Sequence, residues 1–461
     1  MMKFLLVNPA DLERKMFGFL QPQSLGYLAS SIIMNGYDVQ IIDAAKDRIS
    51  PEKLATIVKR EKFDVVGFYV LSPLIRSVRQ YSDEIKKVSP DTIIVVGGPH
   101  PTFEPEHTLY FLKSVDFACV GDGEETLIKI TKQKHNDIPN LVWRKNGEIV
   151  LNHREFVDVN RYPLPAWDLV RPDTYPPLPI GIFSEKTKIA QIVTTRGCPY
   201  PCSFCGVPAI SGKIIRTREH KYIISEIELL VSKYRMEEIH IIDDNITIAP
   251  RKWLIGLLNS LIEANFPVRF ALPSGIRVDL VDEQILELMK KAGFYAFALG
   301  IESYNQKTLD FMKKKLSIQK VIDKLKLIEK YKFHVQGNFI IGYPTENLRD
   351  MVRTISFSLS APINKAGYFI FNPFPGTDEW RNIKGKYPIE MWDKIISTFN
   401  LYRSSKFVER KVGSLILRFI QAFAYFAFYV RPKFLLKNLR KIKSIAQLKV
   451  IFRIISSILT S

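Results

Sequence analysis

Cysteine and long hydrophobic runs are both scarce in this chain of 461 residues. Four cysteines without a framework spacing exclude a disulfide-stapled secreted domain and favour a reducing cytoplasm. The apolar run within residues 1–9 is too short for a signal peptide, and a later run, 422–430, is too short to span a bilayer. We therefore expect a cytoplasmic globular protein of two or three domains.

Acidic residues are nearly absent from the C-terminal end. The net charge is +19, and residues 401–461 contain thirteen lysines and arginines but a single acid, Glu409. That segment therefore carries +12, which argues against a nucleic-acid-binding body. Its apolar run and basic amphipathic pattern predict a helical tail that either contacts a membrane surface or docks on the folded domains.

Three of the four cysteines lie within eight residues, in the spacing Cys198-x3-Cys202-x2-Cys205. Prolines and glycines make this stretch a loop, and the apolar run 189–193 before it predicts a buried strand. Three thiolates can fill three corners of a tetrahedral or cubane site and leave one metal position open. Structural zinc is the weaker interpretation, because the next candidate ligand, His220, lies fifteen residues further on.

This spacing, with Phe204 before the last cysteine, resembles the signature of the radical S-adenosylmethionine superfamily. The resemblance implies that Cys198, Cys202 and Cys205 hold a 4Fe–4S cluster whose fourth iron binds S-adenosylmethionine. It also implies an external electron donor of the flavodoxin or ferredoxin type. The reduced cluster would cleave S-adenosylmethionine to a 5'-deoxyadenosyl radical, which takes hydrogen from an unactivated carbon.

Strands and helices alternate through residues 1–136. Strands are expected at 3–8, 39–42, 65–70, 92–96 and 117–120, with helices at 24–35, 51–60, 75–88 and 108–114. This alternation predicts an α/β doubly wound parallel sheet with a ligand at its strand C-termini. No Gly-x-Gly-x-x-Gly follows the first strand, so a dinucleotide-binding interpretation is weak.

Such a domain ahead of a three-cysteine loop looks like the cobalamin-binding domain of one subgroup of the superfamily. The resemblance places Ser72, Gly97 and Gly98 at the cobalamin, although the two glycines are equally typical of a turn. The Asp-x-His-x-x-Gly motif that supplies a cobalt ligand elsewhere is missing. We expect His100 to be exposed to solvent and not to bind cobalt, and Cys119 to be an inert core thiol.

The alternation resumes after a linker at 137–185, which contains a hairpin pattern at 140–151 and a proline-rich, extended stretch at 161–179. Strands at 189–193, 238–242, 269–272, 295–299, 336–341 and 367–371 predict a partial (β/α)6 barrel over 186–400. Polar residues at the strand ends match the superfamily's cofactor motifs, and each could instead be a cap or turn. The resemblance assigns Asp243, Asp244 and Asn245 to the S-adenosylmethionine amino group, Arg277 to its carboxylate, Glu302 and Ser303 to the ribose or methionine part, and Gly342, in the glycine-containing segment 337–342, to adenine.

Taken together, the resemblance implies a cobalamin-dependent enzyme that methylates a small-molecule or lipid substrate. The layout also looks like the anaerobic magnesium-protoporphyrin monomethyl ester cyclases, which makes an oxidative cyclisation the alternative. A methylthiotransferase would need cysteines for a second cluster, and only Cys119 remains. A non-catalytic cobalamin sensor would leave the cysteine loop without a purpose. The basic tail predicts peripheral contact with the inner face of the membrane.

Overall fold

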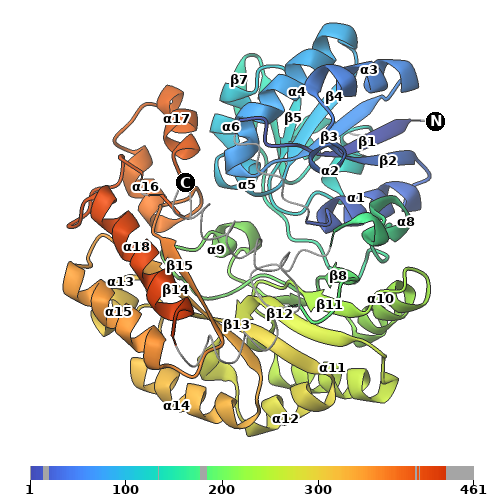
Figure 1. The fold of residues 1–461 in the computed structure, drawn as a ribbon. Helices are drawn as coiled ribbons and strands as arrows, with labels where there is room; N and C mark the ends of the chain where they lie inside the picture. The colour runs from blue at the N-terminus through green and yellow to red at the C-terminus, as the bar shows by residue number, and fades with distance from the viewer. Residues whose placement is uncertain are drawn as a thin grey trace, which may run out of the picture.

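The computed structural model describes residues 2–13, 20–132, 134–176, 184–399, 402–403 and 405–431. Two α/β units lie one above the other (Figure 1). The first holds a seven-stranded sheet and the second a six-stranded sheet. The predicted α/β class and the order of the two units are confirmed.

The N-terminal unit is a doubly wound sheet. Its elements are β1 (Lys3–Asn8), α1 (Gln23–Met34), β2 (Asp38–Asp43), α2 (Ala44–Asp47), α3 (Pro51–Glu61), β3 (Val65–Tyr69), α4 (Ile75–Val88), β4 (Ile93–Gly97), α5 (Pro99–Phe103), α6 (Pro105–Phe111), β5 (Phe117–Cys119) and α7 (Thr126–Lys129). The strand order is β2-β1-β3-β4-β5, all parallel. All five predicted strands are present.

Alternation along β1 explains why helices cover both faces. Leu5 and Val7 pack into one core with residues of α3 and α4, whereas Phe4 and Leu6 pack into a second core with α1 and α7. Because successive strand residues point to opposite faces, an almost continuous apolar strand requires cover on both sides. Because the five strands are parallel, their C-terminal ends lie at one edge of the sheet.

The hairpin pattern at 140–151 belongs to the first sheet. Strands β6 (Leu141–Lys145) and β7 (Glu148–Leu151) extend it in antiparallel order beyond β5. In the proline-rich stretch, α8 (Trp167–Val170) is a short helix that packs beside α1, with Trp167 buried. The connection between the units is therefore partly anchored and not simply extended. Residues 177–183 lie outside the described residues.

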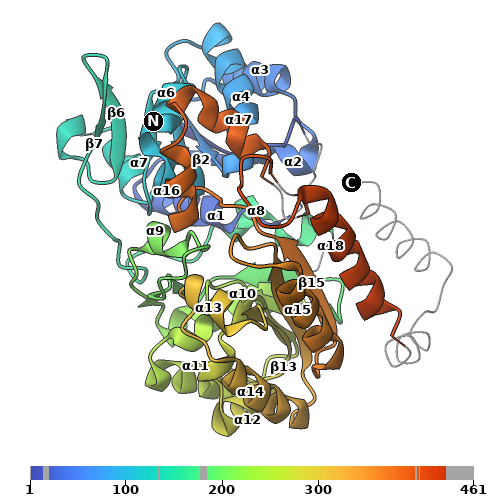
Figure 2. The same cartoon turned by 90° about the vertical axis from the view of Figure 1, so that its left-hand side faces the viewer.

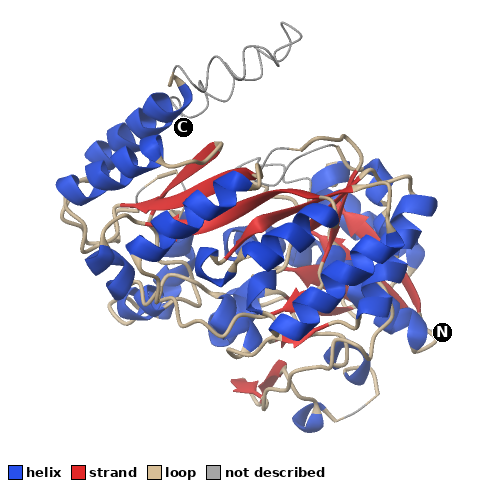
Figure 3. Cartoon of the chain, turned by 90° about the horizontal axis from the view of Figure 1, so that it is seen from below, coloured by secondary structure: helices blue, strands red, loops and turns tan. Residues whose placement is uncertain are grey.

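The second unit is the predicted six-stranded partial barrel. Its strands are β8 (Ile189–Ile192), β11 (Glu238–Ile241), β12 (Arg269–Ile276), β13 (Phe294–Glu302), β14 (His334–Ile341) and β15 (Lys365–Ile370), all parallel and adjacent in that order. The main outer helices are α10 (His220–Ser232), α11 (Arg251–Ala264), α12 (Glu283–Lys291), α14 (Ile318–Lys330) and α15 (Leu348–Ser360). Helices surround the strands when the molecule is seen from below (Figure 3).

Two short strands, β9 (Thr195–Arg196) and β10 (Arg216–Thr217), form a ribbon beside the cysteine loop, with α9 (Val207–Ser211) between them. Helix α13 (Gln306–Phe311) follows β13.

Helix α18 (Ser414–Tyr429) lies against the open edge of β15 (Figure 2). Gln421 Nε2 donates to Tyr368 O over 2.6 Å, Tyr425 Oη accepts from Tyr368 N over 3.1 Å, and Tyr429 Oη donates to Ala366 O over 3.0 Å. Side chains of a helix thus satisfy the edge groups that a seventh strand would otherwise pair. No helix among the described residues is long and apolar enough to cross a membrane.

Helices α16 (Asp378–Lys384) and α17 (Trp392–Ser397) return to the first unit. Trp380 Nε1 donates to Glu104 over 2.7 Å, and Arg76 pairs with Asp393 over 2.8 Å. The C-terminal part of the chain therefore links the two units, in addition to the connection between them.

Candidate active site between the two units

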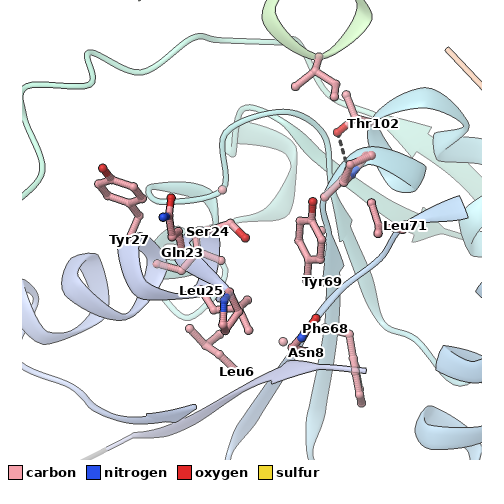
Figure 4. A pocket seen from close by; sticks show the side chains of 18 of the residues that line it. Leu6, Asn8, Gln23, Ser24, Leu25, Tyr27, Phe68, Tyr69, Leu71 and Thr102 are labelled. Atoms are coloured by element: carbon pink, nitrogen blue, oxygen red, sulfur yellow. Dashed lines mark hydrogen bonds between the residues drawn. The ribbon is translucent and has the colours of Figure 1, made fainter. Parts of the chain in front are cut away.

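A cavity of about 800 Å³ lies between the C-terminal edge of the first sheet and the mouth of the barrel. From the first unit, α1 and the ends of β1 and β3 line it with apolar side chains that include Leu6, Leu25 and Tyr69 (Figure 4). From the barrel, the ends of β8 and β11 contribute Gln191, Asp243 and Asp244. One cavity thus touches both predicted cofactor regions.

The cysteine loop depends on Gly197. Its φ is +104°, and a Cβ there would lie 2.1 Å from the carbonyl oxygen of Ile214. Only glycine fits here, because any other residue would be strained at this φ and its Cβ would clash with that oxygen. The backbone N–H of Cys198 then donates to Ser211 Oγ over 3.4 Å, and that of Cys205 to Cys202 O over 3.1 Å.

Two aspartates at the end of β11 hold this loop in place. Asp243 accepts from the Thr194 N–H over 2.6 Å and from the hydroxyls of Thr194 and Thr195 over 2.5 and 2.8 Å. Burial raises the pKa of Asp243 to about 6, against the lowering effect of these hydrogen bonds. Asp244 accepts from the Gly197 N–H over 2.9 Å and keeps its side chain exposed where it lines the cavity.

The three thiols are partly buried, and burial raises the pKa of each, that of Cys205 to about 12. The charges of Lys314 and Arg277 act in the opposite direction on Cys202. No group of three or more His, Cys, Asp or Glu side chains in the described part of the chain is gathered as for one metal ion. Ligands of a cubane cluster bind different irons and need not converge on one point. A glycine-shaped loop with three accessible thiols and nearby cations suits such a cluster.

Gly97 and Gly98 line the cavity at the end of β4. Gly98 has a φ of +104°, and a Cβ there would lie 2.9 Å from the Tyr69 ring, so a side chain cannot be accommodated. At Gly97 no atom lies nearer than 3.9 Å to the position of a Cβ, which leaves the backbone open to a large ligand. Ser72 does not line this cavity; it is buried and bonded to His100 over 3.0 Å.

The expectation that His100 is exposed to solvent is wrong. Its ring is fully buried, with Nδ1 3.0 Å from Ser72 Oγ and Nε2 3.2 Å from His107 Nδ1. Burial lowers its pKa well below the usual value. Helix α5, which begins at Pro99, carries the ring into the protein instead of leaving it on a loop. Cys119 is buried as expected, but it also lines the cavity.

The remaining predicted residues lie at the strand ends and contact protein groups. Asn245 caps its own turn through Thr247. The Arg277 guanidinium binds Asp279 and the carbonyl groups of residues 314 and 315, and it lies 3.7 Å above the Tyr200 ring centroid. Three further predicted residues also contact protein groups. Glu302 pairs with Lys314 over 2.8 Å, and Ser303 donates to Glu346 over 3.0 Å. Gly342 is covered by Leu417 of α18. Their cofactor roles stay predictions.

A charged cluster that the sequence did not reveal joins the two units at the cavity wall. Asp122 binds Arg196 over 3.0 Å and Arg216 over 2.5 Å, and Glu124 binds Arg196 over 2.8 Å. Burial alone would raise the pKa of Asp122, but the two guanidiniums outweigh it and hold that pKa below its usual range. In the sequence, residues 121–125 have the pattern of a helix start with acidic residues. Their pairing with arginines far along the chain becomes visible only in the fold.

Family models match two segments of the chain: the Radical SAM superfamily over residues 192–358 and the B12 binding domain over residues 14–131. The chain is 32% identical over 330 residues to a "Putative methylthiotransferase" of Methanocaldococcus jannaschii, across 69% of each chain. It is also 28% identical over 452 residues to an "Uncharacterized methyltransferase" of Pyrococcus horikoshii, across 95% of each chain. This chain belongs to the radical S-adenosylmethionine superfamily.

Within the superfamily the chain shares its fold with cobalamin-binding members. The radical S-adenosylmethionine methyltransferase TsrM of Kitasatospora setae, solved with cobalamin and a 4Fe–4S cluster, superposes with a TM-score of 0.68. The sequences are 17% identical, and the match covers 84% of this chain and 75% of TsrM. The two family matches make this protein an enzyme whose cofactors are a 4Fe–4S cluster, S-adenosylmethionine and cobalamin. The glycine-lined cavity and the three-thiol loop suit those groups.

Proposed function

We propose that this radical S-adenosylmethionine enzyme methylates an unactivated carbon of a small-molecule or lipid substrate. The observation that carries the proposal is the shared cavity, which is lined by Gly97 and Gly98 of the cobalamin-binding unit and by Asp243 and Asp244 beside the cysteine loop. A methyl carrier and the site of radical formation must both reach one substrate carbon, and a common cavity allows this.

When bound, the cluster supplies the electron that cleaves S-adenosylmethionine, and cobalamin supplies the methyl group. The chain positions these groups and excludes water. Cys198, Cys202 and Cys205 are the cluster ligands in this proposal. Asp244, exposed to the cavity, offers carboxylate oxygen to the amino group of S-adenosylmethionine, while Asp243 fixes the loop through Thr194 and Thr195.

The roles of the other strand-end residues are also part of the proposal. Asn245 stays assigned to the amino group, Glu302 and Ser303 to the ribose or methionine part, and Gly342 to adenine. Arg277 could meet a carboxylate only alongside the contacts that it already makes with Asp279. Ser72 would act on cobalamin indirectly, because its hydroxyl contacts His100 behind the cavity wall.

The proposal is tested by following a labelled methyl group. Anaerobically reconstituted protein, supplied with cobalamin, a reductant and methyl-labelled S-adenosylmethionine, is incubated with cell extract. We expect 5'-deoxyadenosine and labelled small molecules or lipids to appear together, and both to disappear in Cys202→Ala. Formation of 5'-deoxyadenosine without any labelled product would reject methylation and favour the cyclisation alternative.

Three alternatives differ in what they require. An oxidative cyclisation is supported by the likeness to anaerobic magnesium-protoporphyrin IX monomethyl ester cyclase of Rubrivivax gelatinosus, 25% identical over 384 residues. A methylthiotransferase needs a second cluster, and the one further cysteine, Cys119, lies in the other unit. A cobalamin sensor would bind cobalamin but would not cleave S-adenosylmethionine. We favour methylation on the shared cavity.

The proposed partners and compartment complete this function. A flavodoxin- or ferredoxin-type protein would supply electrons, and the enzyme would work in the cytoplasm, in peripheral contact with the inner face of the membrane. No nucleic-acid partner is proposed, because the positive charge is concentrated after residue 400.

A further inference from the structure

Helix α18 has two apolar faces, and only one of them contacts the barrel. Leu417, Ile420, Ala424 and Phe428 are buried in the barrel core. The opposite face is a stripe of large apolar side chains, each between 45% and 67% exposed among the described residues. This stripe, called the α18 stripe below, comprises Leu415, Ile416, Phe419, Phe423, Phe426 and Val430.

Isolated exposed apolar residues are ordinary, but a continuous stripe with three phenylalanines on one helix face indicates an interaction surface. Helix α18 cannot span a bilayer, and its other face is already used to close the edge of β15. Figure 2 shows α18 on the outside of the barrel. The exposed fractions of its side chains place the α18 stripe on the face turned away from the barrel. This fixed position suits shallow contact with a surface better than insertion across one.

Charge identifies the occupant. Helix α18 contains Arg418 and no acidic residue, and the following segment, 432–461, contains seven lysines and arginines and no acid. That segment cannot form ion pairs with α18, and a second copy would place like charges together. Anionic lipid headgroups offer the missing negative charge, while phenylalanine rings suit the boundary between headgroups and acyl chains.

We propose that the α18 stripe is a docking surface for an anionic lipid bilayer, with the basic segment that follows α18 in the sequence adding electrostatic attraction. This inference deepens the proposed membrane contact by naming the surface that makes it. Because α18 packs against strand β15 of the barrel, docking would also hold the barrel in a fixed orientation on the bilayer.

The test uses the full-length reconstituted enzyme and flotation with phosphatidylcholine vesicles, with or without phosphatidylglycerol. The variant is Phe419→Ser/Phe423→Ser/Phe426→Ser, and the control is Ile33→Ser/Met34→Ser, which removes two exposed apolar side chains from α1. We expect binding to phosphatidylglycerol vesicles at low salt, about tenfold or more weaker binding by the α18 variant, and unchanged binding by the control. Added salt should weaken wild-type binding.

Reductive cleavage of S-adenosylmethionine in solution separates this inference from the proposed function. The α18 variant should retain that cleavage, which confirms that it is folded and loaded. Equal vesicle binding by wild type and variant would overturn the proposal. Loss of a stable dimer in the variant, measured by analytical ultracentrifugation, would also overturn it. So would a full-length wild type that binds no vesicles, with binding gained only when residues 432–461 are removed, since that segment would then cover the stripe.

Discussion

At the scale of single residues, Gly197 shows how local backbone geometry prepares the cysteine loop. Its positive φ turns the chain between β9 and Cys198, and the space that a Cβ would fill is occupied by the carbonyl oxygen of Ile214. A substitution here therefore adds a clash to the usual cost of a left-handed conformation, which is about 1–2 kcal/mol. Both effects act directly on the position of the first cysteine.

Gly197→Ala should therefore lose most of its iron after anaerobic reconstitution. Gly147→Ala is the matched control, because Gly147 also has a positive φ, of +87°, but no atom lies within 4 Å of the position of its Cβ. We expect the control to melt a few degrees lower, roughly as the cost of the φ angle requires, and to keep its iron. Equal iron in both variants would show that the clash is relieved elsewhere.

Asp243 predicts a pH dependence that can be isolated by substitution. The folded pKa is about 6 and the ordinary value is 3.8, so between these values the folded state holds a proton that the unfolded state has lost. The free energy of unfolding should therefore fall as the pH rises through this window. The full effect at pH 7 is about 3 kcal/mol.

The measurement is urea unfolding of the protein without cofactors at several pH values. The stability of wild type minus that of Asp243→Asn should fall by about 2 kcal/mol between pH 4 and pH 7, because the amide does not titrate and part of the effect has already occurred at pH 4. Glu263→Gln, which changes an exposed carboxylate on α11, serves as the reference. A difference for Asp243→Asn that stays constant with pH would mean that this carboxyl has an ordinary pKa.

At the scale of elements, α18 completes a barrel that has too few strands to close. An open edge presents unpaired N–H and C=O groups and promotes pairing between chains. Gln421, Tyr425 and Tyr429 cover those groups on β15, and Leu417 packs on Gly342 at the end of β14. The helix is therefore part of the barrel unit.

A chain that ends at residue 412 should aggregate on mild heating, whereas a chain that ends at residue 431 should not, because it keeps α18. Gln421→Leu should lower the free energy of unfolding by about 1 kcal/mol, since Tyr368 O loses its 2.6 Å donor and keeps Tyr425 Oη, at 3.2 Å. Light scattering during a thermal ramp checks the truncations. If both truncated chains behave alike, the edge needs no cover from this helix.

At the scale of the whole molecule, the periodicity of apolar residues predicted the strands of both sheets. It did not predict the contacts between the two units. All five predicted parallel strands of the first unit and all six of the second are present, because buried parallel strands form nearly continuous apolar runs. The cysteine spacing identified the superfamily. The burial of His100 and the pairing of Asp122 with Arg196 depend on residues far apart in sequence, and no local pattern encodes them. Nor does composition reveal that α18 has one buried and one exposed apolar face.

The Asp122 cluster leads to a prediction about how the units cooperate. Asp122 belongs to the cobalamin-binding unit, whereas Arg196 and Arg216 flank the cysteine loop, and the Asp122 and Arg196 side chains line the cavity. Removing one partner of a buried ion pair typically costs about 3–5 kcal/mol. The three side chains here keep 10% to 24% of their surface exposed, which reduces that cost. Glu124 still binds Arg196, so the lower end of that range applies to Asp122→Asn.

Asp122→Asn should therefore lose cobalamin more readily than wild type while keeping its iron, because the three thiols do not depend on this carboxylate. The control is Glu61→Gln, which removes surface pairings with Arg60 at 3.0 Å and Lys3 at 3.5 Å and should change neither property. Cobalamin retained after gel filtration and iron per chain are measured on the same samples. Lowered stability with unchanged cobalamin retention would mean that the cluster only stabilises the contact between the two units. Parallel loss of both cofactors would mean that Arg196 also sets the position of the cysteine loop.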